Sequence, residues 1–330
     1  MKSFFSSIEL FAGAGGLALG LEQAGIQPAC LVECNKYACQ TLLANRSRWN
    51  VICQDIHTVD FSLYKDKIDI VSGGAPCQPF SYSGKRLGFG DIRGTLFAEF
   101  ARCVQEVQPK LFLFENVRGL LSHDKGRTFK TIQHTFESLG YRVQYHILNA
   151  CCYGVGQRRE RVFIIGIRND LSISFHYPKA DSKWTTLKEV LKDCPVSAGQ
   201  SYSDNKKKVM DLVPEGGCWV DLPQDIAKAY MGKSYYSGGG RRGFARRLSW
   251  NEPCLTLTTS PSQKQTERCH PNETRPLTIR EYARIQSFPD EWMFVGSMSE
   301  QYKQIGNAVP VRLAYRIGRE IVSCLMNCKT

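Results

Sequence analysis

A cysteine stands between Pro76 and Gln78 in GGAPCQPFSYSGKRLGFGDIRGTLF, the segment from Gly73 to Phe97. Cys77 could be a buried packing residue, a metal ligand, half of a disulfide or a nucleophile. The surrounding residues are rich in Gly, Ser, Lys and Arg, which suits a packed core poorly. Positive charge near a thiol stabilises the thiolate, the form that attacks carbon. The segment therefore favours a nucleophile.

Two further segments carry residues suited to proton transfer or anion binding. In FENVRGLL, Glu115 directly follows an apolar run. Burial there would raise the pKa of its carboxyl group and make it a plausible proton donor. In QRRER, Gln157–Arg161, three arginines fall within five residues, Arg159 and Arg161 among them. Beside an active site this cluster favours an anionic or carbonyl-bearing substrate over a solvated basic edge.

The segment ELFAGAGGLALG, Glu9–Gly20, favours a nucleoside-type cofactor. Its glycines allow a tight turn and close approach of the backbone to a ligand at a helix N-terminus, although dehydrogenases use similar loops. Glu33 ends the next apolar run, where it could accept hydrogen bonds from ribose hydroxyls. Asp55 follows the third run and could accept from an adenine amino group. The loop lacks a lysine for a triphosphate, which disfavours ATP.

Apolar runs alternate with helical patterns in the first half of the chain, which predicts an α/β fold with a parallel sheet. Because ligands bind outside the carboxyl ends of such strands, Cys77, Glu33 and Glu115 should meet at one edge. The expected strands are 4–10, 29–33, 51–53, 68–72, 111–114, 145–148 and 162–167. The expected helices are 17–24, 36–45, 96–107, 128–139, 278–286 and 311–325.

Charge and cysteine usage narrow the class of protein. A formal charge of +12 and a pI near 9.1 favour a polyanionic partner, nucleic acid before an anionic membrane surface. The 14 cysteines form no CxxC pair and no Cys/His cluster at zinc spacing. With no signal peptide and no membrane-spanning run, reduced thiols, no metal and a cytoplasmic location are expected.

Taken in order, these segments resemble the DNA (cytosine-5) methyltransferase family. FAGAGG is similar to its S-adenosylmethionine loop, GGAPCQPFS to its nucleophile loop, and RGTLF, ENV and QRRER to the blocks that follow. RPLTIREYARIQSFPD, Arg275–Asp290, and YKQIGNAVP, Tyr302–Pro310, resemble the last two. The similarity fades over about 171–273, where the family has its variable target-recognition region. Ala75, Gln54 and Cys34 depart from the pattern, and Cys34 leaves a stacking contact with adenine in doubt.

The resemblance implies a Rossmann-like S-adenosylmethionine-dependent methyltransferase domain and a smaller target-recognition domain across a DNA-binding cleft. We expect the catalytic domain at 1–171, completed by 297–330, and the recognition domain at 172–296. By similarity the cofactor, whose product is S-adenosyl-L-homocysteine, is bound by Phe11, Ala14, Gly15, Gly16, Leu17, Glu33, Cys34, Asp55, Ile56, Gly74, Pro76, Leu96, Asn307, Ala308 and Val309.

The resemblance also implies a mechanism. Cys77 adds to carbon 6 of a flipped-out cytosine, Glu115 holds or protonates ring nitrogen 3, Arg161 contacts the base carbonyl and Arg159 helps to fix the site's loops. No side chain is an obvious base for the carbon 5 proton, which leaves water. The expected DNA contacts are Gln78, Ser81, Ser83, Lys85, Arg93, Arg241, Arg242, Arg246, Arg247 and Thr256.

Three other functions were weighed against an active DNA methyltransferase. A tRNA cytosine methyltransferase of the same fold usually carries a Cys-Phe-Thr segment, which this sequence lacks. A DNA-binding protein without activity would need neither Cys77 nor Glu115, and a nicotinamide dehydrogenase would leave PCQ, ENV and QRRER unexplained. The compact size suits a monomeric modification enzyme that acts on double-stranded DNA and protects it from a cognate restriction endonuclease.

Overall fold

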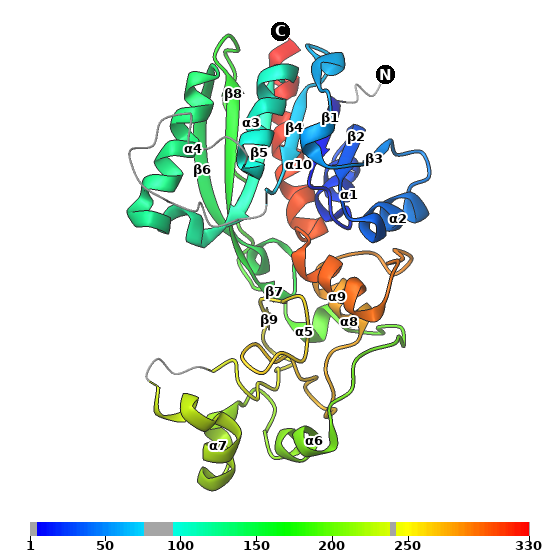
Figure 1. Cartoon of the computed structure of the whole chain (residues 1–330), viewed down its shortest axis with the longest axis vertical. Helices are drawn as coiled ribbons and strands as arrows, with labels where there is room; N and C mark the ends of the chain where they lie inside the picture. The colour runs from blue at the N-terminus through cyan, green and yellow to red at the C-terminus, as the bar shows by residue number, and fades with distance from the viewer. Residues whose placement is uncertain (1–4, 76–94, 238–241, 330) are drawn as a thin grey trace. The chain divides into compact units, whose positions relative to one another are not determined.

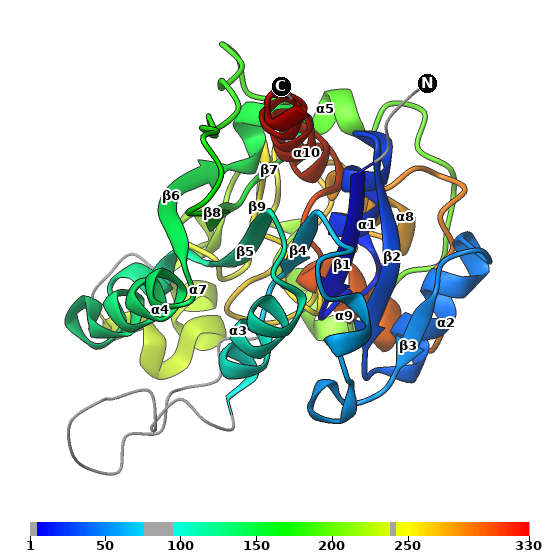
Figure 2. The same ribbon diagram turned by 90° about the horizontal axis from the view of Figure 1, so that it is seen from above.

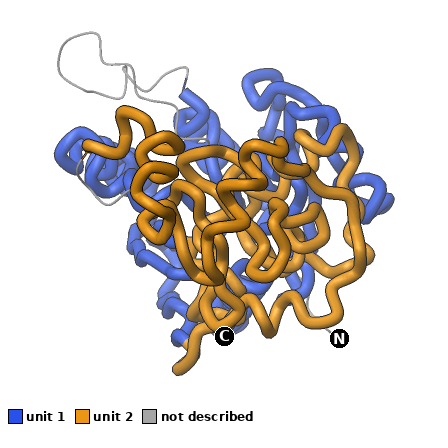
Figure 3. Tube along the Cα trace, turned by 90° about the horizontal axis from the view of Figure 1, so that it is seen from below, with its two compact units in different colours: residues 1–149, 160–180, 311–330 blue, residues 150–159, 181–310 orange. Residues whose placement is uncertain are grey.

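The computed structural model describes residues 5–75, 95–237 and 242–329, which form two compact units. Unit 1 contains residues 1–149, 160–180 and 311–330, and unit 2 contains residues 150–159 and 181–310 (Figure 3). Each unit is built from segments that are distant in the sequence.

A seven-stranded sheet forms the centre of unit 1, with the strand order β3-β2-β1-β4-β5-β8-β6 (Figure 1). Strand β8 is antiparallel to both of its neighbours, and the other pairs are parallel. The mostly parallel sheet expected from the sequence is confirmed. The strands are β1 Phe5–Leu10, β2 Ile26–Glu33, β3 Val51–Cys53, β4 Ile70–Gly73, β5 Leu111–Val117, β6 Tyr141–Asn149 and β8 Glu160–Arg168.

Helices cover both faces of this sheet. Helices α1 and α10 lie on one face, and α3 and α4 lie on the other (Figure 2). The inner sides of α3 and α4 pack Phe97, Phe100 and Phe136 against Phe112 and Phe114 of β5 in edge-to-face contacts. The helices of unit 1 are α1 Gly16–Gln23, α2 Lys36–Asn45, α3 Leu96–Val107, α4 Arg127–Ser138 and α10 Val311–Met326.

Close packing between α1 and α10 depends on glycine. A Cβ atom at Gly20 would lie 2.4 Å from the carbonyl oxygen of Val311, and one at Gly318 would lie 2.7 Å from the Cβ of Ala24. The two helices therefore approach more closely than a larger side chain at either position permits. Through this contact, the last helix in the sequence completes the face of the sheet that the first helix begins.

Unit 2 has little regular structure. Its two-stranded sheet pairs β7 with β9 in parallel, and a small core gathers around Met210, Val213 and Leu222. The strands are β7 Gln157–Arg158 and β9 Cys254–Leu255, and the helices are α5 Leu187–Val190, α6 Asp204–Asp211, α7 Gln224–Met231, α8 Ile279–Ile285 and α9 Met298–Asn307. In the two units together, 3-10 turns occur at Ile56–Thr58, Ser62–Tyr64, Arg118–Leu121, His123–Gly126, Ala150–Tyr153, Trp219–Asp221, Gly232–Tyr236 and Asn327–Lys329.

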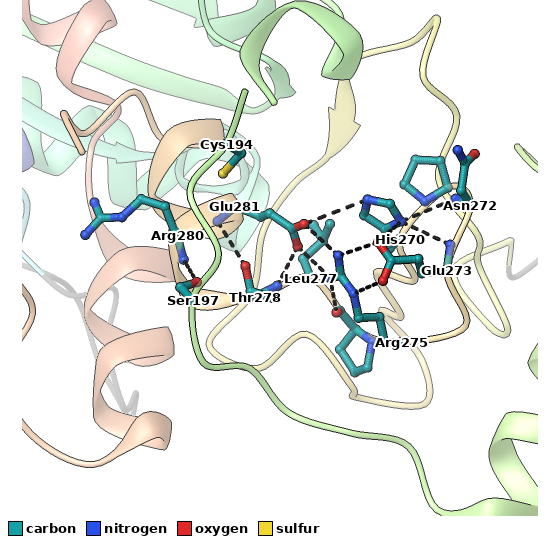
Figure 4. Close-up of polar contacts among 12 residues, drawn as sticks. Cys194, Ser197, His270, Asn272, Glu273, Arg275, Leu277, Thr278, Arg280 and Glu281 are labelled. Atoms are coloured by element: carbon teal, nitrogen blue, oxygen red, sulfur yellow. Dashed lines mark hydrogen bonds and ion pairs between the residues drawn. The ribbon is translucent and has the colours of Figure 1, made fainter. Parts of the chain in front are cut away.

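Ionic and polar contacts fix the start of α8 (Figure 4). Arg275 contacts both oxygens of Glu281 at 2.8 and 2.9 Å, and Glu281 accepts the N–H of Thr278 at 2.7 Å, closing a capping box. The Nδ1 atom of His270 accepts the N–H groups of Asn272 and Glu273. Burial lowers the pKa of His270, consistent with a neutral ring that accepts at Nδ1. Charged side chains thus fix the start of α8, whose Ile279, Tyr282 and Ile285 are buried.

The bounds of the two units differ from those of the expected domains. Residues 172–180 belong to unit 1, and residues 150–159 and 297–310 belong to unit 2. Pairing of β7 with β9 accounts for the second difference in part, since Gln157 and Arg158 align with Cys254 and Leu255. The discontinuity of the sheet-containing unit was expected, but assigning catalysis and recognition to the two units stays a prediction.

Within the described ranges, no helix is both long enough and apolar enough to span a membrane. The same residues contain no group of three or more His, Cys, Asp or Glu side chains arranged to hold a metal ion.

Candidate active site

A carboxylate and a guanidinium meet where β5 and β8 pair. Strand pairing aligns Val117 with Arg161, two residues beyond Glu115, so both side chains can reach the same side of the sheet. The Nε atom of Arg161 lies 3.1 Å from Oε1 of Glu115, and both side chains are largely buried. A Cβ atom at Gly74 would stand 2.6 Å from Oε2 of Glu115, so only glycine leaves room for the carboxylate. Two predicted catalytic residues and one predicted cofactor residue are thus in one place.

Asn116 anchors the chain just before the predicted nucleophile. Its side-chain amide donates to the carbonyl oxygen of Ala75 at 3.1 Å and accepts the N–H of Val117 at 2.9 Å. Asn116 is only 6% exposed, so the contact with Ala75 is shielded from water. Asn116 belongs to the ENV motif, but no role was predicted for it. The sequence feature that could have indicated a role is the position of Asn116 directly after the predicted acid, Glu115.

Several predicted residues lie outside the described ranges. They are Pro76, Cys77, Gln78, Ser81, Ser83, Lys85 and Arg93, which follow Ala75 in the sequence, and Arg241. Leu96 is the first residue of α3, whose preceding residue, Thr95, caps the helix by accepting the N–H of Ala98. The chain on both sides of the Cys77 segment therefore has a defined position in unit 1.

The glycine-rich turn after β1 has the conformation that its sequence requires. Phe11, Gly13 and Gly15 have positive φ angles of 57°, 54° and 82°. This backbone is costly for residues with a Cβ, which explains the glycines and marks Phe11 as strained. Gly15 is the N-cap residue of α1, and Ala14, Gly16 and Leu17 are buried around it. The turn presents backbone N–H groups at the start of a helix, as a nucleoside cofactor site needs.

One acidic side chain, Glu33, contacts this turn, and a second, Asp55, follows β3 in the sequence. Glu33, at the end of β2, accepts the N–H of Gly13 at Oε2 and that of Asn35 at Oε1, both at 2.8 Å. Each carboxylate oxygen has a second lone pair, so both can still accept from a ligand hydroxyl. Asp55 is exposed, and the N–H of His57 lowers the pKa of its carboxyl group. The available groups are acceptors, which match the hydroxyl and amino donors of an adenosyl cofactor.

Two more predicted cofactor residues adjoin these acids. Ile56 is buried and directly follows Asp55, whereas Cys34 is exposed and follows Glu33. A buried apolar side chain beside an exposed acid suits one edge of a planar base. These positions are compatible with the predicted adenosyl site, and the contacts themselves stay predictions.

Glu9, in β1 behind the turn, is a buried carboxyl group that sequence analysis did not single out. It is 2% exposed, and its Oε2 atom has no hydrogen-bond partner among the described residues. Burial raises the pKa of Glu9 to about 8, partly opposed by the N–H of Ala18 in the first turn of α1. A neutral acid thus lies between β1 and the helix that carries the glycine-rich turn.

In unit 2, Arg159 joins segments that are far apart in the sequence. Its guanidinium donates to the carbonyl oxygens of Leu257 and Asn307, each at 3.4 Å, and the residue is 2% exposed. These contacts agree with the loop-fixing role expected for Arg159. Asn307 is exposed, Ala308 and Val309 are buried, and all three belong to unit 2.

A chain of buried amides extends these contacts. Gln157 accepts the N–H of Leu257 at 2.8 Å and donates to Gln286 at 2.9 Å. Gln286 in turn donates to the carbonyl oxygens of Ile305 and Ala308. Sequence analysis missed both glutamines, because an amide is equally common on a surface. The sequence feature that could have indicated a role is their position in two motifs: Gln157 lies in QRRER and Gln286 lies in RPLTIREYARIQSFPD.

The arginines expected to contact DNA differ in their surroundings. Arg242 is exposed and Arg246 is half-buried. Arg247 is 5% exposed, and its three nitrogens donate to the carbonyl oxygens of Met210, Val213, His270, Pro271 and Glu273 and to the hydroxyl of Thr274. We therefore correct the interpretation of Arg247: its guanidinium stabilises unit 2 and has no donor left for DNA. Thr256 donates its hydroxyl to the carbonyl oxygen of Arg158.

The sheet order, its single antiparallel strand and the acidic groups beside a glycine-rich turn define a Rossmann-like methyltransferase class. Residues 5–323 match the C-5 cytosine-specific DNA methylase family, and the chain belongs to this family. It is a DNA (cytosine-5-)-methyltransferase, and its family uses S-adenosylmethionine.

Similar proteins include two named Type II methyltransferases. The chain is 55% identical to M.Eco47II of Escherichia coli over 98% of its own length and 80% of the relative's. It is 58% identical to M.Sau96I of Staphylococcus aureus over 97% and 76%, respectively. The expected family and enzyme class are confirmed. The expectation that the enzyme is a methyltransferase of the restriction–modification kind is confirmed as well.

Solved structures share the fold. A putative DNA modification methyltransferase encoded within an E. coli prophage superposes with a TM-score of 0.71 at 26% identity, covering 98% of this chain and 99% of that one. A DNMT2 mutant of Spodoptera frugiperda gives a TM-score of 0.66 at 19% identity, covering 98% and 99%. The second similarity concerns the fold alone.

Proposed function

We propose that this enzyme methylates a flipped-out cytosine in one short double-stranded DNA sequence, through a covalent adduct with Cys77. The ion pair between Glu115 and Arg161 beside Gly74 is the observation that supports the proposal best. The pair places an acid and a positive charge beside Gly74. Gly74 directly precedes Ala75, the last described residue before the Cys77 segment. Cys77 follows Ala75 by two residues.

The chemistry follows from the weakness of cytosine carbon 5 as a nucleophile. The Cys77 thiolate adds to carbon 6, which moves electron density onto carbon 5. Glu115 donates a proton or a hydrogen bond to ring nitrogen 3 and so accepts the negative charge that the addition creates. Arg161 holds the carboxyl group of Glu115 in place and donates to the base carbonyl. The activated carbon 5 would take up the methyl group that bound S-adenosylmethionine supplies, and loss of the carbon 5 proton to water would then expel Cys77.

The cofactor site is formed by the groups around the glycine-rich turn. S-adenosylmethionine, when bound, supplies an electrophilic methyl group. Glu33 accepts from the ribose hydroxyls, Asp55 accepts from the adenine amino group, and Ile56 contacts the base edge. Phe11, the remaining residues of the turn, Cys34, Gly74, Pro76, Leu96 and Asn307–Val309 complete the proposed set. None of these roles requires a metal ion.

Two sets of residues contact DNA in this proposal. The target atom is inaccessible within a stacked duplex, so the base must leave the helix. Gln78, Ser81, Ser83, Lys85 and Arg93 contact the backbone or the extruded nucleotide. Arg241, Arg242, Arg246 and Thr256 contact phosphates or guanine edges. Arg247 is no longer part of this set.

The biological role proposed is protection of host DNA in the cytoplasm from a cognate restriction endonuclease. The named Type II relatives support this role. One chain that carries its own reader and active site can act as a monomer.

Bisulfite sequencing tests the proposal directly. The native chain and a Cys77→Ser variant are expressed separately in a bacterial host that lacks DNA methylation. Protection of cytosine within one short motif, only with the native chain, is the expected result. A Glu115→Gln variant should retain the motif with a rate lower by about 100-fold or more. Equal protection by the Cys77→Ser variant would refute the covalent route, and methylation of tRNA alone would refute DNA as the substrate.

A further inference from the structure

Two thiols meet at the main chain of Glu33, the residue proposed to hold the cofactor ribose. Cys39, in α2, donates its S–H to the carbonyl oxygen of Glu33 at 3.3 Å. Cys53, the last residue of β3, is aligned with Glu33 in the parallel pairing of β2 with β3. The side chain of Cys53 is within hydrogen-bonding reach of Cys39. The strand register and the hydrogen bond thus bring both sulfurs to one side of Glu33.

The two thiols differ in their access to solvent. Cys53 is exposed, whereas Cys39 is buried, and neither takes part in a disulfide. An exposed thiol reacts first with an oxidant, and a second thiol in contact with it then resolves the product. Burial and the neighbouring Cys53 raise the pKa of Cys39, which lowers its thiolate content, so Cys39 is the poorer first target of the oxidant and suits the second role, attack on the oxidised sulfur of Cys53.

We propose that Cys39 and Cys53 form an oxidisable dithiol site, and that their disulfide weakens cofactor binding at Glu33. The second part rests on the proposed function. The oxidant is a peroxide: the Cys53 thiolate attacks its O–O bond, giving a sulfenic acid and hydroxide. The sulfur of Cys39 then attacks the sulfenic sulfur, the S–S bond forms, and the hydroxide that leaves takes up the Cys39 proton as water. Two thiols are oxidised and one peroxide is reduced.

The link to the cofactor is the contact with Glu33. Forming the S–S bond removes the S–H that now donates to its carbonyl oxygen and draws α2 and β3 together, because the sulfurs must close to about 2 Å. Asn35, which caps α2, also donates its N–H to the carboxylate of Glu33. Movement of α2 therefore shifts the carboxylate that accepts from ribose. Losing those hydrogen bonds to a charged group should raise the Kd for S-adenosylmethionine about tenfold.

The test uses the full chain with Cys77→Ser, which removes the predicted nucleophile as a competing site of oxidation. After treatment with hydrogen peroxide, tryptic peptides are mapped without reduction. Cys39 falls in peptide 37–46 and Cys53 in peptide 49–65, whereas Cys34 falls in peptide 3–36. The expected product joins the first two peptides with a mass about 2 Da below their sum. Calorimetry should show the weaker cofactor binding, reversed by dithiothreitol.

Two variants in the same background identify the pair. Cys53→Ser should bind the cofactor like its parent and lose the response to peroxide, and Cys194→Ser, in unit 2, should keep the response. A bridge to peptide 3–36, or the absence of any bridge, would overturn the dithiol site. A bridge between Cys39 and Cys53 with unchanged affinity would overturn its coupling to the cofactor. If the reduced protein does not bind S-adenosylmethionine, the proposed cofactor site fails, whereas the mapped bridge still decides the chemistry.

Discussion

Replacing Glu9 with Gln should remove a pH-dependent loss of stability. The native carboxyl group is buried, and burial raises its pKa from 4.5 to about 8. The folded protein therefore holds a proton that the unfolded chain releases above about pH 4.5. Stability from this group is fully present below that pH and is lost as the pH rises through 8. A neutral glutamine cannot take part in this exchange.

The magnitude follows from proton linkage. For each unit that the pH rises between the two pKa values, the free energy of unfolding falls by about 1.4 kcal/mol. Between about pH 5.5 and about pH 7.5, the native protein should lose about 2.5 kcal/mol of unfolding free energy relative to Glu9→Gln. The buried amide of Gln adds its own cost, since Oε2 of Glu9 has no described partner, but that cost does not change with pH. The difference between the two pH values isolates the carboxyl group.

Urea unfolding at both pH values measures this difference. Trp49 is the only tryptophan among the residues of unit 1, so a chain with its other four tryptophans replaced by Phe reports on that unit through fluorescence. The Glu9→Gln substitution is made in this background, and the background chain itself is the control. A stability difference that stays constant from about pH 5.5 to about pH 7.5 would refute a buried, protonated Glu9.

Three other substitutions, the first with a matched control, test contacts described above. Arg247→Met should lower the unfolding free energy by about 3 kcal/mol or more, whereas Arg242→Ala should leave it unchanged and weaken DNA binding most at low salt; the reverse pattern would place Arg247 at the DNA. Gly20→Ala should cost about 1–3 kcal/mol in calorimetry, because its Cβ would meet Val311, and a native Tm would contradict that packing. Asn116→Ala should lower kcat with little change in cofactor Kd, and an unchanged kcat would exclude its positioning role.

The sequence predicted the elements of unit 1 well, because their apolar periodicity is strong. All seven expected strands are present, and β5 shows why the site could be located: Glu115 follows an apolar run and so lies near the carboxyl end of the strand, where ligands bind in such sheets. The ion pair with Arg161 was not predicted. It depends on β8 running antiparallel beside β5, a pairing between residues 46 positions apart that no local pattern specifies.

Burial of charge was the main property that the sequence did not reveal. The sequence around Arg247 does not distinguish it from Arg242. Only the carbonyl groups that surround the guanidinium of Arg247 make that arginine a structural residue. Glu9 likewise reads as an ordinary acid before a glycine-rich turn. Its neutral form depends on burial between α1 and the neighbouring strands β2 and β4, and those two strands come from segments further along the sequence.

The packing of α10 on α1 has a consequence for biosynthesis. A ribosome releases α1 early, but the helix that covers its glycine-rich surface emerges only after residues 181–310 have been made. During that interval the nascent chain exposes Gly20 and the apolar residues around it to solvent and to chaperones. Unit 2 can begin to compact in this time, because all of its segments precede residue 311 in the chain. We therefore expect unit 1 to be the last part of the nascent chain to resist protease, and to do so only once residues 311–326 are free of the ribosome.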